Sequence, residues 1–286
     1  MHLRAMRTED IPAGLRLCRL ANWNQVAEDW RFFLASSPDG CRVAEEHGSV
    51  IGTVATIAYG AEFSWIGMVL VDPQHRRGGI GTRLLHEALD VLGNGTTARL
   101  DATPAGRTVY VPLGFVDEYE LQRMVRPATV RLSAGPGRVR LQADRGLRPM
   151  SDADFAEVLT FDRDVFGADR RALLERLRNE APEYAWAIGG AQVDGYVFGR
   201  HGHLFEHVGP IVAHDEATAG LLVSACVSAH VDRPFMVDAP HRTSWVAWLA
   251  SHGFSLQRRF TRMRRGEPRF RERVDHLFAI AGPEFG

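Results

Sequence analysis

The stretch MVLVDPQHRRGGIGTRLL, residues 68–85, decides the fold of this 286-residue chain. It begins as an apolar β-type run, passes through a turn containing Gly78, Gly79 and Gly81, and ends in leucines that continue at helical spacing. Glycine lets the main chain approach a ligand closely, and the first N–H groups of a helix have no partner within it. A strand that leads through such a turn into a helix therefore predicts a cradle for a diphosphate group.

Two arginines and a threonine strengthen this interpretation. Arg76 and Arg77 supply charge-assisted donors to phosphate oxygens, and Thr82 can cap the helix or bond a phosphate oxygen. The segment is not a Walker A motif, because the chain contains no lysine, and it lacks the third glycine of a GxGxxG loop, because Leu84 stands there. The alternative is that the glycines form only a tight turn.

The flanking sequence predicts further elements on both sides of this turn. A helix is expected at residues 11–20, with Thr8 as its cap, and β-branched runs predict antiparallel strands at 41–45, 50–58 and 64–71. Beyond the turn we expect a helix, a strand at 100–103, a short helix at 108–113 and a strand from Phe115.

The spacing of Arg76, Gly79 and Gly81, between a strand and a helix, resembles the acyl-donor loop of the GNAT acyltransferase superfamily. The segment ATPAGRTVYVPLGF, residues 102–115, is similar to the family's second signature, in which a tyrosine lies beside the thiol of coenzyme A; Tyr110 has that position. The resemblance implies an α/β (α+β) fold with two tandem GNAT-like domains, each a mixed, mostly antiparallel twisted sheet flanked by helices.

The resemblance also implies the chemistry, which is transfer of an acetyl group from acetyl-CoA to an amine. Tyr110, with an ordinary pKa of about 10, can protonate the departing thiolate; alternatively it is a core aromatic. The implied donor-binding residues are the main chain of Val69, Leu70 and Val71 and the turn residues Arg76, Arg77, Gly78, Gly79, Ile80, Gly81 and Thr82.

Groups for the acceptor amine are less clearly marked. Glu62 and Asp101 are carboxylates from which a water-mediated proton path could begin. Each has a structural alternative, Glu62 as a solvated turn residue and Asp101 as the partner of an arginine, and some amines lose their proton to bulk water. Trp23, Asn24 and Trp30 are candidates for the acceptor pocket, or else residues of two helices that pack in the core.

A repeat in the sequence predicts a tandem duplication. LGF at residues 113–115 returns as HGF at residues 252–254, and the arginine–methionine pair that follows each keeps the same offset of 139 residues. Short matches at residues 23–25 and 39–41 resemble a GNAT subgroup with a degenerate second domain. We place the boundary near residue 140, which gives an acetyl-CoA-binding domain at residues 1–139 and a degenerate GNAT-like domain at 140–286.

The second half carries the pattern of the fold without the diphosphate turn. Residues 208–222 align with the first-half strand and helix, but Asp215 and Glu216 replace the arginines and repel a pyrophosphate. We therefore expect no coenzyme A there. Asp238 and His241, at the end of a predicted strand, are candidate acceptor contacts; alternatively they lie at a solvated strand end.

Composition excludes several classes of protein. A net charge of -1 leaves no overall field to attract nucleic acid or anionic lipid, and the arginine-rich stretch 258–273 predicts a strand with a solvated polar face. Three scattered cysteines suit neither a disulfide framework nor a metal pair. The charged N-terminal residues and the absence of a long apolar run predict neither a signal peptide nor a membrane span, so a cytoplasmic protein is expected.

The sequence thus favours an N-acetyltransferase for an unidentified small-molecule or protein amine, without nucleic acid, membrane or metal as a partner. A non-catalytic acyl-CoA sensor or regulatory protein is the alternative, and a DNA-binding regulator is a third hypothesis. The sequence leaves open whether the protein forms a homodimer.

Overall fold

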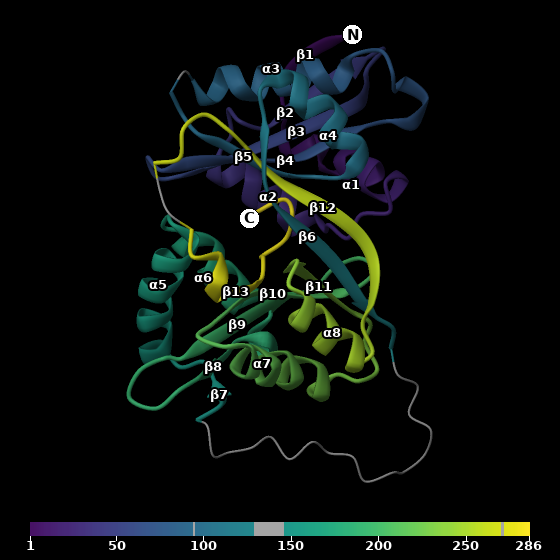
Figure 1. The fold of residues 1–286 in the computed structure, drawn as a ribbon. Helices are drawn as coiled ribbons and strands as arrows, with labels where there is room; N and C mark the ends of the chain where they lie inside the picture. Colours follow the sequence, from purple (N-terminus) through teal and green to yellow (C-terminus); the bar gives the residue numbers. More distant parts are fainter. Residues whose placement is uncertain (94, 129–145, 270–271) are drawn as a thin grey trace.

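A single sheet of 13 strands runs through the described part of the molecule (Figure 1). The computed structural model describes residues 1–93, 95–128, 146–269 and 272–286. Among the described strand pairs only two are parallel, which confirms the predicted mixed, mostly antiparallel α/β fold.

The elements of the first half agree closely with those predicted. They are β1 (His2–Ala5), α1 (Ile11–Leu20), α2 (Ala27–Ser36), β2 (Arg42–Glu46), β3 (Ser49–Tyr59), β4 (Phe63–Val71), α3 (Ile80–Leu92), β5 (Ala98–Ala102), α4 (Pro104–Tyr110) and β6 (Val116–Arg126). Thr8 lies in the 3-10 helix η1 (Thr8–Asp10) and does not cap α1. The short helix α4 starts earlier than predicted, because Thr103 caps it by accepting a hydrogen bond from the main-chain N–H of Gly106 at 3.1 Å.

The second half repeats this order. Its elements are β7 (Arg148–Pro149), α5 (Asp152–Phe166), α6 (Arg171–Glu180), β8 (Trp186–Ile188), β9 (Gly195–Arg200), β10 (Glu206–Ala213), α7 (Glu216–Ala229), β11 (Phe235–Pro240), α8 (Thr243–Ser251), β12 (Ser255–Arg265) and β13 (Leu277–Ala279). The described residues also form the 3-10 helices η2 (Pro73–His75), η3 (Val111–Leu113), η5 (Pro182–Tyr184) and η6 (Val274–His276). The strand order in the sheet is β1-β2-β3-β4-β5-β12-β6-β11-β10-β9-β8-β7, and β13 pairs with β10. The two parallel pairs are β4–β5 and β10–β11.

The two halves exchange equivalent strands. The strand β12 of the second half pairs with β5 and β6 of the first, and β6 in turn pairs with β11 of the second. Both β6 and β12 directly follow the repeated LGF and HGF segments, so the duplication accounts for their equivalence. The two expected sheets are therefore continuous. The predicted domain boundary near residue 140 lies within residues 129–145, outside the described residues.

The sheet separates two apolar layers in the first half. Trp65 and Ile66, neighbours on β4, point to opposite faces, as successive strand residues must. Trp65 packs in the cluster that contains residues of α1 and α2 and aromatic residues of the second half, such as Phe166. Ile66 packs in the cluster that contains Leu84 and Leu85 of α3. The first of these clusters contains residues of both halves, so its packing stabilises their contact.

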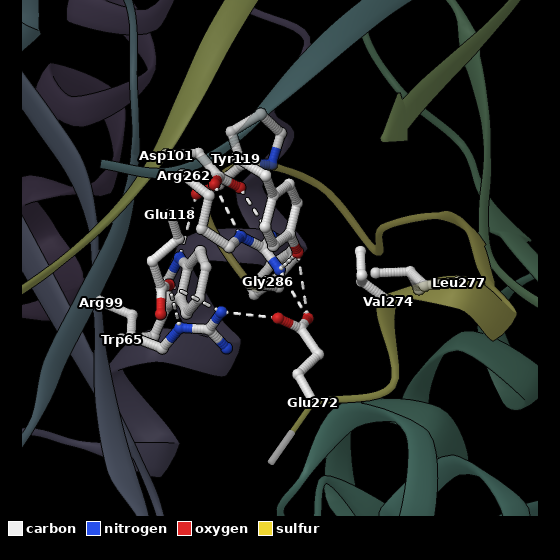
Figure 2. A network of polar contacts seen from close by, with 12 residues as sticks. Trp65, Arg99, Asp101, Glu118, Tyr119, Arg262, Glu272, Val274, Leu277 and Gly286 are labelled. Carbon is white, nitrogen blue, oxygen red and sulfur yellow. Dashed lines mark hydrogen bonds and ion pairs between the residues drawn. The ribbon is translucent and has the colours of Figure 1, made fainter. Parts of the chain in front are cut away.

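A buried polar network fixes the exchanged strand β12 (Figure 2). Arg262 is fully buried and donates to both carboxylate oxygens of Asp101, each at 2.9 Å, and to Tyr119 and Glu272 at 2.7 and 3.0 Å. Burial opposes its charge, but Asp101, Tyr119 and Glu272 hold the pKa of Arg262 well above its ordinary value. The predicted solvated face of this strand is thus wrong at Arg262, because Trp65, Tyr119 and Glu272 cover its guanidinium.

None of the helices in the described residues is both long and apolar enough to cross a membrane. Within the same residues, no group of three or more histidine, cysteine, aspartate or glutamate side chains could hold a metal ion.

Candidate active site

The parallel strands β4 and β5 separate and leave a slot between them. They pair only at Ser64–Ala98 and Trp65–Arg99, near the start of each strand. Farther along, β4 carries a bulge at Met68, whose φ is 55°, and the Thr53 hydroxyl stabilises it by donating to the Met68 carbonyl at 2.8 Å. Among the residues that the structure describes, none pairs as a strand with the residues after this bulge on the β5 side. Main-chain donors of Val69, Leu70 and Val71 are the groups that the sequence predicted for the donor arm.

The glycine-rich turn follows directly and its backbone is held open. Asp72 caps η2, and Arg16 bonds its carboxylate at 2.5 Å and lowers its pKa. Arg77 and Gly79 have left-handed backbone, with φ of 68° and 75°. Gly79 is the N-cap of α3, so Thr82 does not cap the helix as one prediction had it. A Cβ on Gly79 would meet no atom within 4 Å, so no side chain packs against the turn at this position.

The slot and the turn open into one cavity of about 1010 Å³. Its walls come from β4, the turn and start of α3, the end of β5, α4, the segment between α1 and α2, and the strands β6 and β12. The turn residues Arg76, Arg77, Gly79, Ile80, Gly81 and Thr82 line one side of it. Cavities of this size hold a large organic ligand, so a nucleotide with a long arm fits the space and the donors present.

Tyr110 stands at the wall of the cavity, as the sequence predicted. It ends α4, it is mostly buried, and burial raises its pKa to about 12. Its ring packs against Phe115 with centroids 6.0 Å apart. Gly106 makes room for it, since a Cβ there would lie 3.0 Å from the Tyr110 ring. A phenol placed in this way remains a proton donor throughout the neutral and mildly basic range.

The two carboxylates proposed as bases have other roles. Asp101 lines the cavity, but both its oxygens accept hydrogen bonds from Arg262, so it is the arginine partner that the alternative described. Glu62 precedes β4 at the far end from the turn and folds its carboxylate back over Gly60. From Glu62 to Val69 the chain covers roughly 23 Å at about 3.3 Å per residue, which is too far for a water-mediated proton path.

Of the three residues predicted for the acceptor pocket in the first half, the structure places one at the cavity and two elsewhere. Trp23 lines the cavity. Trp30 is fully buried beneath Gly14, so it belongs to the core and not to the pocket. Asn24 holds the second half in place: its Oδ1 accepts from the main-chain N–H of Leu204 and Phe205 at 2.8 and 3.0 Å. The placements of Trp30 and Asn24 correct the prediction.

Asp238 and His241 are also placed away from the cavity wall. Asp238 is fully buried and forms two hydrogen bonds of 2.8 Å with Arg123. Burial opposes the Asp238 charge, but Arg123 and His207 lower its pKa below the ordinary range. His241 hydrogen-bonds the Gln122 amide at 2.8 Å. Asp238 thus acts on the cavity only through Arg123, which does line it.

The sequence missed the wall opposite the turn. It is formed by Gln25, Arg123, Arg258, Phe260 and Glu284. Gln25 lies in residues 23–25, which match a GNAT subgroup, so the sequence did offer a signal for this residue. The others come from strands β6 and β12 and the last residues of the chain, and only the strand exchange brings them here.

The second half fills its equivalent slot with its own chain. The strands β10 and β11 also pair only near their starts, at Glu206–Phe235 and His207–Met236. Beyond that point β13 enters, with Ile211 opposite Ala279, and the Ile280 N–H donates to the Asp238 carbonyl at 2.9 Å. By the alignment of the halves, Ile211 corresponds to Val69. On β10 the position that corresponds to Val69 is therefore paired with β13, whereas β5 does not pair with β4 at Val69.

These features define an acyltransferase of the GNAT class: a mixed sheet, a splayed parallel pair, and an arginine- and glycine-rich turn at a helix start. Residues 37–117 and 158–279 each match the Acetyltransferase (GNAT) domain. The chain belongs to the GNAT superfamily as a tandem member with two such domains.

Known proteins align with this chain over most of its length. The chain is 26% identical over 256 residues to an uncharacterized N-acetyltransferase, YitH, of Bacillus subtilis (strain 168), covering 87% of this chain and 86% of that protein. It is 26% identical over 285 residues to the holothin acyltransferase of Pseudoalteromonas sp. (strain SANK 73390), covering 96% of this chain and 93% of that protein. The crystal structure of a putative acetyltransferase from Pyrococcus horikoshii superposes with a TM-score of 0.79 at 22% identity, covering 100% of this chain and 95% of that one.

Proposed function

We propose that the protein transfers an acetyl group from acetyl-CoA to an amine, using the first half as the donor site. The observation that carries this proposal is the unpaired edge of β4 leading into the open arginine–glycine turn. A donor arm can add to this edge like a strand, with its diphosphate at the N–H groups that begin α3.

The reaction needs charge to be stabilised at two atoms. The neutral amine attacks the thioester carbon, a C–N bond forms, and the C–S bond breaks. Main-chain N–H groups at residues 69–71 can donate to the carbonyl oxygen as it gains charge. Tyr110 protonates the leaving thiolate and recovers a proton from solvent, to which the amine nitrogen has lost its own. No carboxylate is assigned as the base, since Asp101 is paired and Glu62 is remote.

The donor site is tested by replacing both arginines of the turn. Arg76→Gln with Arg77→Gln removes two cations that would face the diphosphate, and charge-assisted hydrogen bonds contribute about 1.5–3 kcal/mol each. We expect the Kd for acetyl-CoA, measured by calorimetry, to rise at least tenfold, with a weaker dependence on salt. Arg83→Gln, in the exposed part of α3 and outside the cavity wall, is the control. Unchanged affinity in the double variant would argue against binding at this turn.

A second expected result concerns the number of sites. Because β13 pairs with β10 where a donor arm would bind, we expect calorimetry to give one acetyl-CoA bound per chain. A stoichiometry of two, or one that persists in the Arg76→Gln, Arg77→Gln variant at unchanged affinity, would mean that the second half binds the donor.

A further inference from the structure

An uncompensated positive charge lies on the wall opposite the turn. Arg258 on β12 lines the main cavity, and it also lines a second, surface hollow of about 630 Å³ next to Leu204 and Gln257. The described residues offer its guanidinium no hydrogen-bond or ion-pair partner. Burial and the neighbouring cation Arg123 lower the pKa of Arg258. In the sheet, β5 is the one strand between β12 and β4.

The charges around Arg258 are already neutralised. Arg123, its partner in the register of β12 and β6, is bound to Asp238 through two hydrogen bonds. Glu284, the carboxylate on the same wall, is ion-paired with Arg200. Of the three charged side chains on this wall, Arg258 is the one without an ion-pair partner among the described residues.

A buried hydrogen-bond acceptor without a donor lies on the same wall. Gln25 is only 4% exposed, and its Oε1 has no partner among the described residues. A buried polar atom without a partner destabilises the fold, so an N–H from a ligand would relieve that cost. Trp23 and Phe260 add aromatic surface between these polar groups.

We propose that the acceptor is an amine that also carries a carboxylate, such as an amino acid or a short peptide. Arg258 would bind the carboxylate and Gln25 would accept a hydrogen bond from an N–H of the acceptor. A single unpaired guanidinium matches one negative charge, which favours a carboxylate over a phosphate with its charge of about -1.5 to -2. This inference rests on the proposed acetyl transfer.

The test uses matched amines and thiol release from acetyl-CoA. Alanine, phenylalanine and alanyl-alanine are each compared with their carboxamides, which keep the amine and lose the negative charge. We expect the wild-type kcat/KM to be at least tenfold higher for one or more of the carboxylates than for its carboxamide. In Arg258→Gln this preference should disappear, chiefly through a higher KM, and Arg258→Lys should restore part of it. The Kd for acetyl-CoA should stay unchanged in both variants.

Arg259→Gln is the control, because it changes the neighbouring residue on the same strand, whose side chain is 58% exposed and outside the cavity wall. It should keep the carboxylate preference. Equal or faster turnover of the carboxamides by the wild type, or a preference that survives in Arg258→Gln, would overturn this inference alone. Failure of every amine to release thiol would overturn the proposed acetyl transfer, and this inference with it.

Discussion

Tyr110→Phe is expected to lower kcat for acetyl transfer by about 10²-fold or more while leaving the Kd for acetyl-CoA unchanged. The substitution removes only the phenolic proton donor, and general acids contribute about 10²–10⁴ to rates. Burial raises the pKa of Tyr110 to about 12, so the residue stays protonated below that pH. The wild-type rate should therefore show no decline between about pH 8 and pH 10 that arises from this group.

The control for this variant is Tyr184→Phe, a buried tyrosine of the second half that lies outside the cavity and whose hydroxyl contacts Arg233. It should keep the wild-type kcat. If Tyr110→Phe turned over as fast as the wild type, the tyrosine would be a packing residue, as the alternative had it. If acetyl-CoA bound but no amine released thiol in any form of the protein, the acyl-CoA sensor would replace the enzyme as the better description.

Arg262→Met is expected to destabilise the fold by about 3–5 kcal/mol, the usual cost of removing one partner of a buried ion pair. The substitution would leave Asp101 buried without its cation and would remove the hydrogen bonds to Tyr119 and Glu272. Because Arg262 belongs to the second half and Asp101 to the first, the loss should appear as a weakened junction between them. Urea unfolding followed by circular dichroism measures this loss in the free energy of unfolding.

Two companion variants separate charge from packing. Arg259→Met, on the exposed side of the same strand, should change the free energy of unfolding by no more than about 0.5 kcal/mol. Adding Asp101→Asn to Arg262→Met should recover part of the loss, because the uncompensated charge is then removed. Similar losses in Arg262→Met and Arg259→Met would mean that this network does not hold the strand.

The donor side of the site could be predicted from local sequence, because its parts are close together along the chain. One strand, one turn and one helix start supply Val69 to Thr82, and the residue types there report the backbone they need. Tyr110 could be placed for a similar reason, since its signature lies in one short segment. The prediction of Asp101 as a base was wrong because a carboxylate in a strand gives no sign of its partner. Arg262, which occupies Asp101, is 161 residues away.

The sequence alone determined the fold class, the tandem repeat and the glycine-rich turn, since periodicity, glycine placement and a repeated segment are properties of neighbouring residues. Only the tertiary structure decided what faces the turn. It placed β12 between β5 and β6, brought Arg258 and Phe260 to the first-half cavity, and put β13 into the second-half slot. Pairing of strands far apart in the chain depends on the free energy of the whole sheet, which no local pattern records.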